Sequence, residues 1–111
     1  MGNSMDPNAP SDVDVIVAQL MPGYLKNREL DLKLLKGFLE QKDWKAIENI
    51  AHRLKGSSAA YGLPLLGEMG STLEESARLK DLQAVSDGIL KIEAFVLIQI
   101  QKFRASSEPT K

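Results

Sequence analysis

The sequence has no cysteine, only one histidine and few aromatic residues, which make up 5% of its 111 residues. Without cysteine, the chain can form no disulfide, no thiolate zinc site and no cysteine nucleophile, which suits a reducing compartment. An excess of charge is also missing, since 14 basic residues face 15 acidic ones. This balance argues against nucleic acid as a partner, because binding to a phosphate backbone needs a basic patch.

Long apolar runs are missing too. The longest, residues 94–98, is far shorter than the roughly 20 residues that a membrane span needs. Residues 1–10 are polar and have no apolar core like that of a signal peptide. We therefore expect a cytoplasmic protein with no membrane partner.

Sequence signatures of common enzymes do not occur. The chain has no Gly-x-Gly-x-x-Gly, no Walker loop, and no Ser/His/Asp arrangement whose third member can be identified. A zinc site would need three or four ligands, and with one histidine and no cysteine, carboxylates such as Glu48 would have to supply the rest. We therefore expect a protein that is not an enzyme and binds neither a metal nor a cofactor.

Helical periodicity runs through nearly all of the chain, and no strand alternation or hairpin signal interrupts it. Ser11 or Asp12 can cap a short first helix, and Pro22 suits the first turn of a second helix. Three later helices are bounded by capping and breaking residues. These residues are Asp43, Gly62, Pro64 and Asp81.

The breaks between the later helices are only a few residues long, so successive helices are expected to lie antiparallel. The sequence therefore predicts an all-α fold, an up-down-up-down antiparallel four-helix bundle with an additional short N-terminal helix. We expect this bundle to form one domain over residues 11–104. Residues 1–10 are expected to be a disordered segment, where Met5 indicates that the residues before it are a cloning remnant, and residues 105–111 a flexible tail.

The only histidine, His52, lies on a helix face that apolar residues avoid. At about 100° per residue, the apolar positions of this helix cluster opposite His52. These positions are Ile47, Ile50, Leu54 and Tyr61. Lys55 follows one turn later, so its ammonium group can reach a group attached to the imidazole. The pattern indicates an imidazole that faces solvent, and taken alone it also allows a histidine that is merely solvated.

Small and charged residues share the face of His52. Gly56 and Ala59 carry almost no side chain, although a glycine inside a helix costs about 1 kcal/mol relative to alanine. A site that something large must approach closely explains this cost. Lys45 and Glu48 fall on the same face, so Lys45, Glu48, Gly56 and Ala59 are the candidate partner-binding residues.

Residues 52–58, which read His-Arg-Leu-Lys-Gly-Ser-Ser, resemble the signature of histidine-containing phosphotransfer (HPt) domains. These domains are the shuttle modules of two-component phosphorelays. Other residues also fall where such domains have similar ones. They are Ala51 and Gly62, the turn at residues 41–44, and the pairs Leu73-Glu74 and Lys80-Asp81. The resemblance covers roughly residues 12–104.

By this resemblance, His52 accepts a phosphoryl group on Nε2 from a receiver-domain aspartate and passes it to another receiver domain. Lys55 would stabilise the charge of the phosphoryl group, and the receiver domain would supply Mg²⁺. The resemblance implies a phosphocarrier without an ATP-binding or kinase site. Its expected partners are the receiver domains of response regulators or hybrid sensor kinases, and we expect a monomer.

Two alternatives from other classes stay open at this point. One is a helical interaction module that is not phosphorylated. The other is the phosphoacceptor domain of a chemotaxis-type kinase, which has a related bundle. The intact set of His52, Lys55 and Gly56 argues against a degenerate relative.

Overall fold

A computed structural model describes residues 12–107, which form helices and short turns with no strand. The helices are α1 (Asp12–Gln41), α2 (Trp44–Ser57), α3 (Pro64–Arg78) and α4 (Leu82–Ser107), with a 3₁₀ turn, η2 (Ser58–Tyr61), between α2 and α3. The predicted disordered segment, the cap candidate Ser11 and residues 108–111 lie outside the described range. Residues 105–107 of the predicted tail belong to α4. None of these helices has an apolar stretch long enough to cross a membrane.

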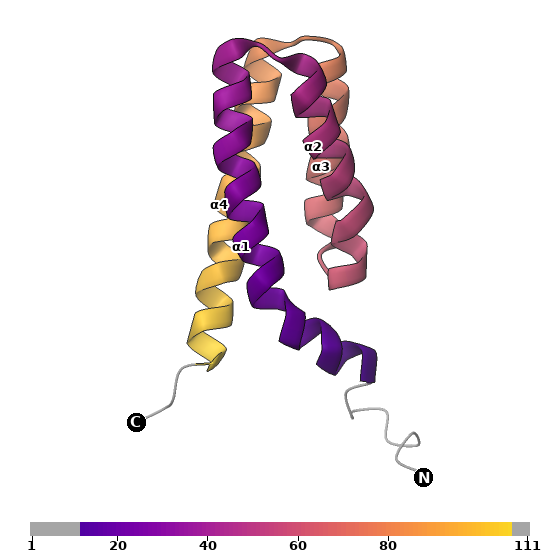
Figure 1. The fold of residues 1–111 in the computed structure, drawn as a ribbon, viewed down its shortest axis with the longest axis vertical. Helices are drawn as coiled ribbons and strands as arrows, with labels where there is room; N and C mark the ends of the chain where they lie inside the picture. The colour runs from indigo at the N-terminus through magenta and orange to yellow at the C-terminus, as the bar shows by residue number, and fades with distance from the viewer. Residues whose placement is uncertain (1–11, 108–111) are drawn as a thin grey trace.

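The helices form a bundle in which each packs against two others, in the cyclic order α1, α2, α3, α4. In Figure 1 the chain reverses at each connection, because α1 rises to the top, α2 descends, α3 rises and α4 returns to the bottom. Apolar side chains from all four helices fill the space between them, and their burial is the main favourable contribution to folding. The largest fully buried ones are Leu35, Ile47, Leu54, Leu66, Leu73, Val85, Ile92 and Val96. The all-α class with four helices in a bundle is therefore confirmed.

Local signals in the sequence set several helix ends. Asp43 Oδ1 accepts a hydrogen bond from the backbone N–H three residues later, at 3.2 Å, and Asp81 Oδ1 does the same at 3.1 Å. Both residues therefore cap the helices that follow them. Gly62 ends η2 with a φ of 71°, in the left-handed region that favours glycine. Pro64 opens α3 at its first turn, where the missing N–H is no loss.

The predicted division of the N-terminal region into a short helix and a second helix is wrong. Residues 12–41 form the single helix α1, and Pro22 lies inside it. A proline inside a helix removes one backbone hydrogen bond and bends the axis, and the first turns of α1 lean away from the bundle in Figure 1. The chain stays helical through Pro22, and Phe103 of α4 contributes to a groove on either side of it. Phe103 lines one groove with Val15, before the proline, and another with Leu25, after it.

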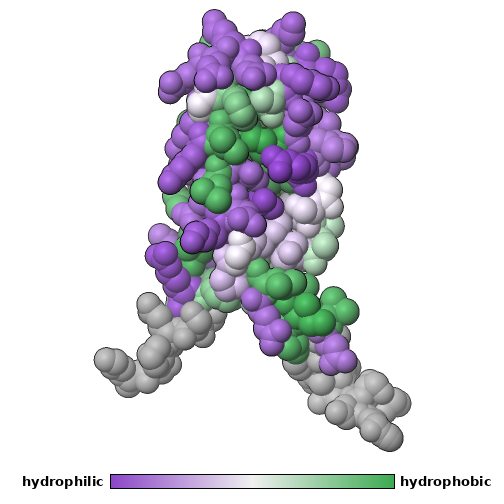
Figure 2. Space-filling view, in the orientation of Figure 1, coloured by the Kyte–Doolittle hydropathy of each residue, from purple (hydrophilic) through white to green (hydrophobic). Residues whose placement is uncertain are grey.

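The first turns of α1 extend beyond the end of α2. Tyr24 marks this end, because its hydroxyl oxygen lies 2.9 Å from Ser57 Oγ. The apolar residues Val13, Ile16 and Leu20 come before it and are 66%, 53% and 52% exposed. Figure 2 shows apolar atoms at the lower right, where Figure 1 places the start of α1. These residues therefore add little to the core.

Gly70 of α3 lets this helix approach α2 closely. A Cβ atom at Gly70 would lie 2.9 Å from the backbone nitrogen of Lys55 and 3.0 Å from the carbonyl oxygen of Ala51. Gly67, one turn earlier, has more room, since the nearest atoms would lie 3.5 and 3.6 Å from such a Cβ. Because Ala51 precedes His52, this close approach brings α3 against the part of α2 that carries the histidine.

Candidate functional site

His52 lies on α2 with its imidazole directed outward. Its side chain is 69% exposed. The opposite face of α2 is buried against the bundle, through Ile47, Ile50, Ala51 and Leu54. Because this apolar face packs against α1 and α3, the helix cannot rotate and the imidazole stays at the surface. The predicted exposure of the histidine is confirmed.

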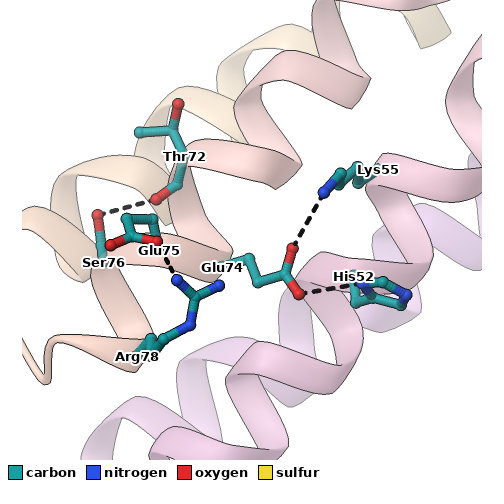
Figure 3. A network of polar contacts seen from close by, with 7 residues as sticks. All are labelled: His52, Lys55, Thr72, Glu74, Glu75, Ser76 and Arg78. Atoms are coloured by element: carbon teal, nitrogen blue, oxygen red, sulfur yellow. Dashed lines mark hydrogen bonds and ion pairs between the residues drawn. The ribbon is translucent and has the colours of Figure 1, made fainter.

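A carboxylate from α3 contacts the ring of His52. Glu74 Oε2 lies 3.0 Å from His52 Nδ1, and Glu74 Oε1 lies 3.7 Å from Lys55 Nζ (Figure 3). The Glu74 side chain is only 15% exposed, so its charge is largely withdrawn from water and shared between two partners. Within the described part of the chain, no group of three or more His, Cys, Asp or Glu side chains is placed to hold a metal ion.

The contact with Glu74 determines which ring nitrogen is available. A carboxylate only accepts hydrogen bonds, so Nδ1 of His52 is the protonated nitrogen that donates. In the neutral ring, Nε2 then carries the lone pair, and Figure 3 shows this nitrogen on the side of the ring away from Glu74. The arrangement presents a nitrogen nucleophile at the surface, with the ammonium group of Lys55 nearby.

Three of the four candidate partner-binding residues share helix α2 with His52. On α2, Lys45 is exposed and Glu48 is half-buried. Gly56 is exposed, and no other part of the protein lies within 4 Å of the position that a Cβ would take. Ala59 is exposed as well, but it belongs to η2, so the α-helical geometry used to place it beside His52 does not apply. An approaching partner therefore meets open space at Gly56.

The end of α2 is fixed to α1 by aromatic and hydroxyl groups. The rings of Tyr24 and Tyr61 stack with their centroids 3.9 Å apart, and the Tyr24 hydroxyl group contacts Ser57 Oγ at 2.9 Å. Ser58 Oγ donates a hydrogen bond to the carbonyl oxygen of Leu54 at 2.6 Å. These contacts hold the C-terminal turn of α2, and with it the open surface next to the histidine.

Glu74 is the site residue that was not among the candidates predicted from the sequence. It lies 22 positions after His52 on another helix, so helical periodicity gives no signal that the two side chains meet. Only the packing of α3 on α2, closest at Gly70, brings them together. The one available signal was that the pair Leu73-Glu74 falls where HPt domains have similar residues.

Comparison with known protein families matches residues 9–104 of the 111-residue chain to the Hpt domain. Comparison with curated proteins and with solved structures finds no match. The family match confirms the resemblance carried by residues 52–58. Hpt domains are phosphocarrier modules that interact with receiver domains, and they are not kinases. The chain therefore belongs to the Hpt domain family, the phosphotransfer modules of phosphorelays.

Proposed function

We propose that His52 is the phosphoacceptor of this Hpt domain. It takes a phosphoryl group on Nε2 from the aspartate of one receiver domain and passes it to the aspartate of another. The observation that carries this proposal is the 3.0 Å contact between Glu74 and His52 Nδ1, because it leaves Nε2 as the unprotonated, outward nitrogen. His52 is also the only histidine of the chain.

Phosphoryl transfer depends mainly on positioning and on offsetting the charge of the phosphoryl oxygens. Glu74 positions the imidazole of His52, because its contact restricts rotation of the ring. Lys55 offsets the charge of these oxygens, since its side chain is 52% exposed and lies one turn from His52, within reach of oxygens on Nε2. In this proposal Mg²⁺ is bound by the receiver domain and not by this chain.

The transfer step can be written with all electrons assigned. The lone pair of His52 Nε2 forms the N–P bond while the bond between phosphorus and the aspartate oxygen breaks. The receiver carboxylate leaves with that electron pair. The onward step is the reverse reaction with the aspartate of a second receiver domain.

The receiver domain docks, in this proposal, on the surface around His52 formed by Lys45, Glu48, Gly56 and Ala59. Open space at Gly56 allows the close approach that transfer needs. Charges of both signs at Lys45 and Glu48 provide a means of selecting among receiver domains. We place the module in the cytoplasm because the chain has no cysteine, and we treat it as a monomer because one chain supplies all the site residues.

Labelling experiments test this function. The domain is expected to take label from a radiolabelled phospho-receiver domain and none from ATP alone. The label should be acid-labile and alkali-stable, as for a phosphoramidate. His52→Gln should abolish labelling and leave the helical circular dichroism unchanged, because the side chain is 69% exposed. Label that persists in His52→Gln would contradict the assignment, and a wild type that takes no label would favour an unphosphorylated interaction module.

The same assay measures the contribution of Lys55. Lys55→Ala should slow transfer roughly tenfold to a hundredfold, less than the loss of a buried donor, because the side chain is half exposed. Lys91 lies on α4, which packs against α1 and α3, so Lys91→Ala removes the same type of side chain from a helix that does not carry His52 and is the matched control. If Lys55→Ala and Lys91→Ala transfer at the wild-type rate, Lys55 is an ordinary surface lysine.

A further inference from the structure

Glu74 is a carboxylate at a position where a neutral amide would orient the ring equally well. A glutamine oxygen can accept a hydrogen bond from Nδ1–H just as Glu74 Oε2 does at 3.0 Å. The negative charge is therefore more than orientation requires.

The negative charge of Glu74 has a role once the imidazole of His52 is phosphorylated. When the phosphoryl group leaves Nε2, the electron pair of the N–P bond stays on that nitrogen. With a proton on Nδ1, the ring leaves as neutral imidazole. Without that proton it would have to leave as imidazolate, which is a much stronger base and a poorer leaving group. Release of the phosphoryl group therefore proceeds through the ring that is protonated on Nδ1.

We propose that Glu74 keeps Nδ1 of phosphorylated His52 protonated and so holds the phosphoryl group ready for release. The inference rests on the proposed function of His52. In the release step the N–P bond breaks, its electron pair stays on Nε2, Nδ1 keeps its proton, and a P–O bond forms to the receiver aspartate. Glu74 touches neither phosphorus nor the aspartate, so it is a positioning residue that acts through the ring.

Glu74 is the charged group in contact with the ring, and further charged side chains lie on α2 and on the helices packed against it. The others are Lys45, Glu48, Arg53 and Lys55 on α2, the ion-paired Glu75 and Arg78 on α3 (Figure 3), and the ion pair of Arg28 and Asp31 on α1, which packs against α2. Lys55 and Arg78 disfavour a positive ring. Glu74 favours it from hydrogen-bonding distance, where the interaction between charges is strongest.

Chemical phosphorylation tests the inference without any receiver domain. Potassium phosphoramidate would be used to phosphorylate His52 directly, and phosphorus NMR would follow the loss of phosphohistidine from about pH 5 to about pH 9, the range around the usual titration of histidine. Wild type, Glu74→Gln and the control Glu75→Gln would be compared. Glu75 contacts Arg78 and not the ring, so its variant removes one negative charge from the same turn of α3.

Glu74→Gln should move the midpoint of the pH profile to lower pH. Near pH 8 its phosphohistidine should persist about tenfold longer than that of the wild type, and the two profiles should converge near pH 5, where both rings are protonated. Glu75→Gln should follow the wild type. Superimposable profiles for wild type and Glu74→Gln would overturn the inference, whatever a receiver domain does to His52.

A second measurement needs no variant. Proton–nitrogen NMR of the chemically phosphorylated wild type should show a proton on Nδ1 near pH 8, and an unprotonated Nδ1 there would overturn the inference. Neither measurement involves a receiver domain. Failure of His52 to accept a phosphoryl group from any receiver would therefore contradict the proposed function separately.

Discussion

Gly70→Ala is expected to lower the free energy of unfolding by about 1–2 kcal/mol, a large change for one methyl group. The added Cβ would lie 2.9 Å from the backbone nitrogen of Lys55 and 3.0 Å from the carbonyl oxygen of Ala51. Both atoms belong to the backbone of α2, which can yield only if the two helices separate. Overpacking of this kind costs about 1–3 kcal/mol, and the gain from replacing a helical glycine, up to about 1 kcal/mol, offsets part of it.

Thermal unfolding followed by circular dichroism measures this effect. In a domain of this size, each kcal/mol shifts Tm by roughly 4–8 °C. Gly67→Ala is the matched control, because its nearest atoms would lie at ordinary contact distances of 3.5 and 3.6 Å, and it should melt at or above the wild-type temperature. If the two variants are equally stable, α2 and α3 do not touch as closely at Gly70 as described.

Gly56→Leu is expected to slow phosphotransfer from a receiver domain roughly hundredfold, equivalent to about 2.7 kcal/mol, with Tm unchanged or raised. The new side chain would fill the open space that a docking receiver domain needs. It meets no other part of the protein at the Cβ position, and the helix gains up to about 1 kcal/mol by losing a glycine. Transfer kinetics and a melting curve on the same sample separate the two effects.

Gln101→Leu provides the control for an added leucine. Gln101 is exposed on α4, and α4 packs against α1 and α3, so the same apolar side chain is placed away from His52. Transfer should then proceed at the wild-type rate. A Tm that drops by many degrees in Gly56→Leu would mean that Gly56 packs against a neighbouring helix, contrary to an open docking surface.

Several helix ends could be predicted from the sequence because their causes are local. Asp43 and Asp81 cap with their own side chains, and Gly62 adopts a conformation that few other residues tolerate. The role of Pro22 could not be predicted from the neighbouring sequence. A proline fits both the start of a helix and a bend within one, so Pro22 alone does not distinguish two helices from the single helix α1.

The site also combines features that one helix determines with a feature that depends on how two helices pack. The exposure of His52 and the nearness of Lys55 follow from the geometry of a single helix, and both could be predicted. Glu74 depends on the distance between two helices, and that distance is set by the clearance at Gly70. No periodic pattern in one sequence contains this information, so the residue that orients the imidazole became visible only in the folded chain.

Assignment of the phosphorylated atom by NMR tests the central claim most directly. Nitrogen-labelled domain would be phosphorylated by a phospho-receiver domain, and phosphorus–nitrogen coupling would identify the bonded nitrogen. The structure predicts phosphorus on Nε2 of His52, with the proton on Nδ1, because Glu74 occupies the Nδ1 side of the ring at 3.0 Å. Phosphorus on Nδ1, or on another residue such as Ser57, would contradict this account of the site.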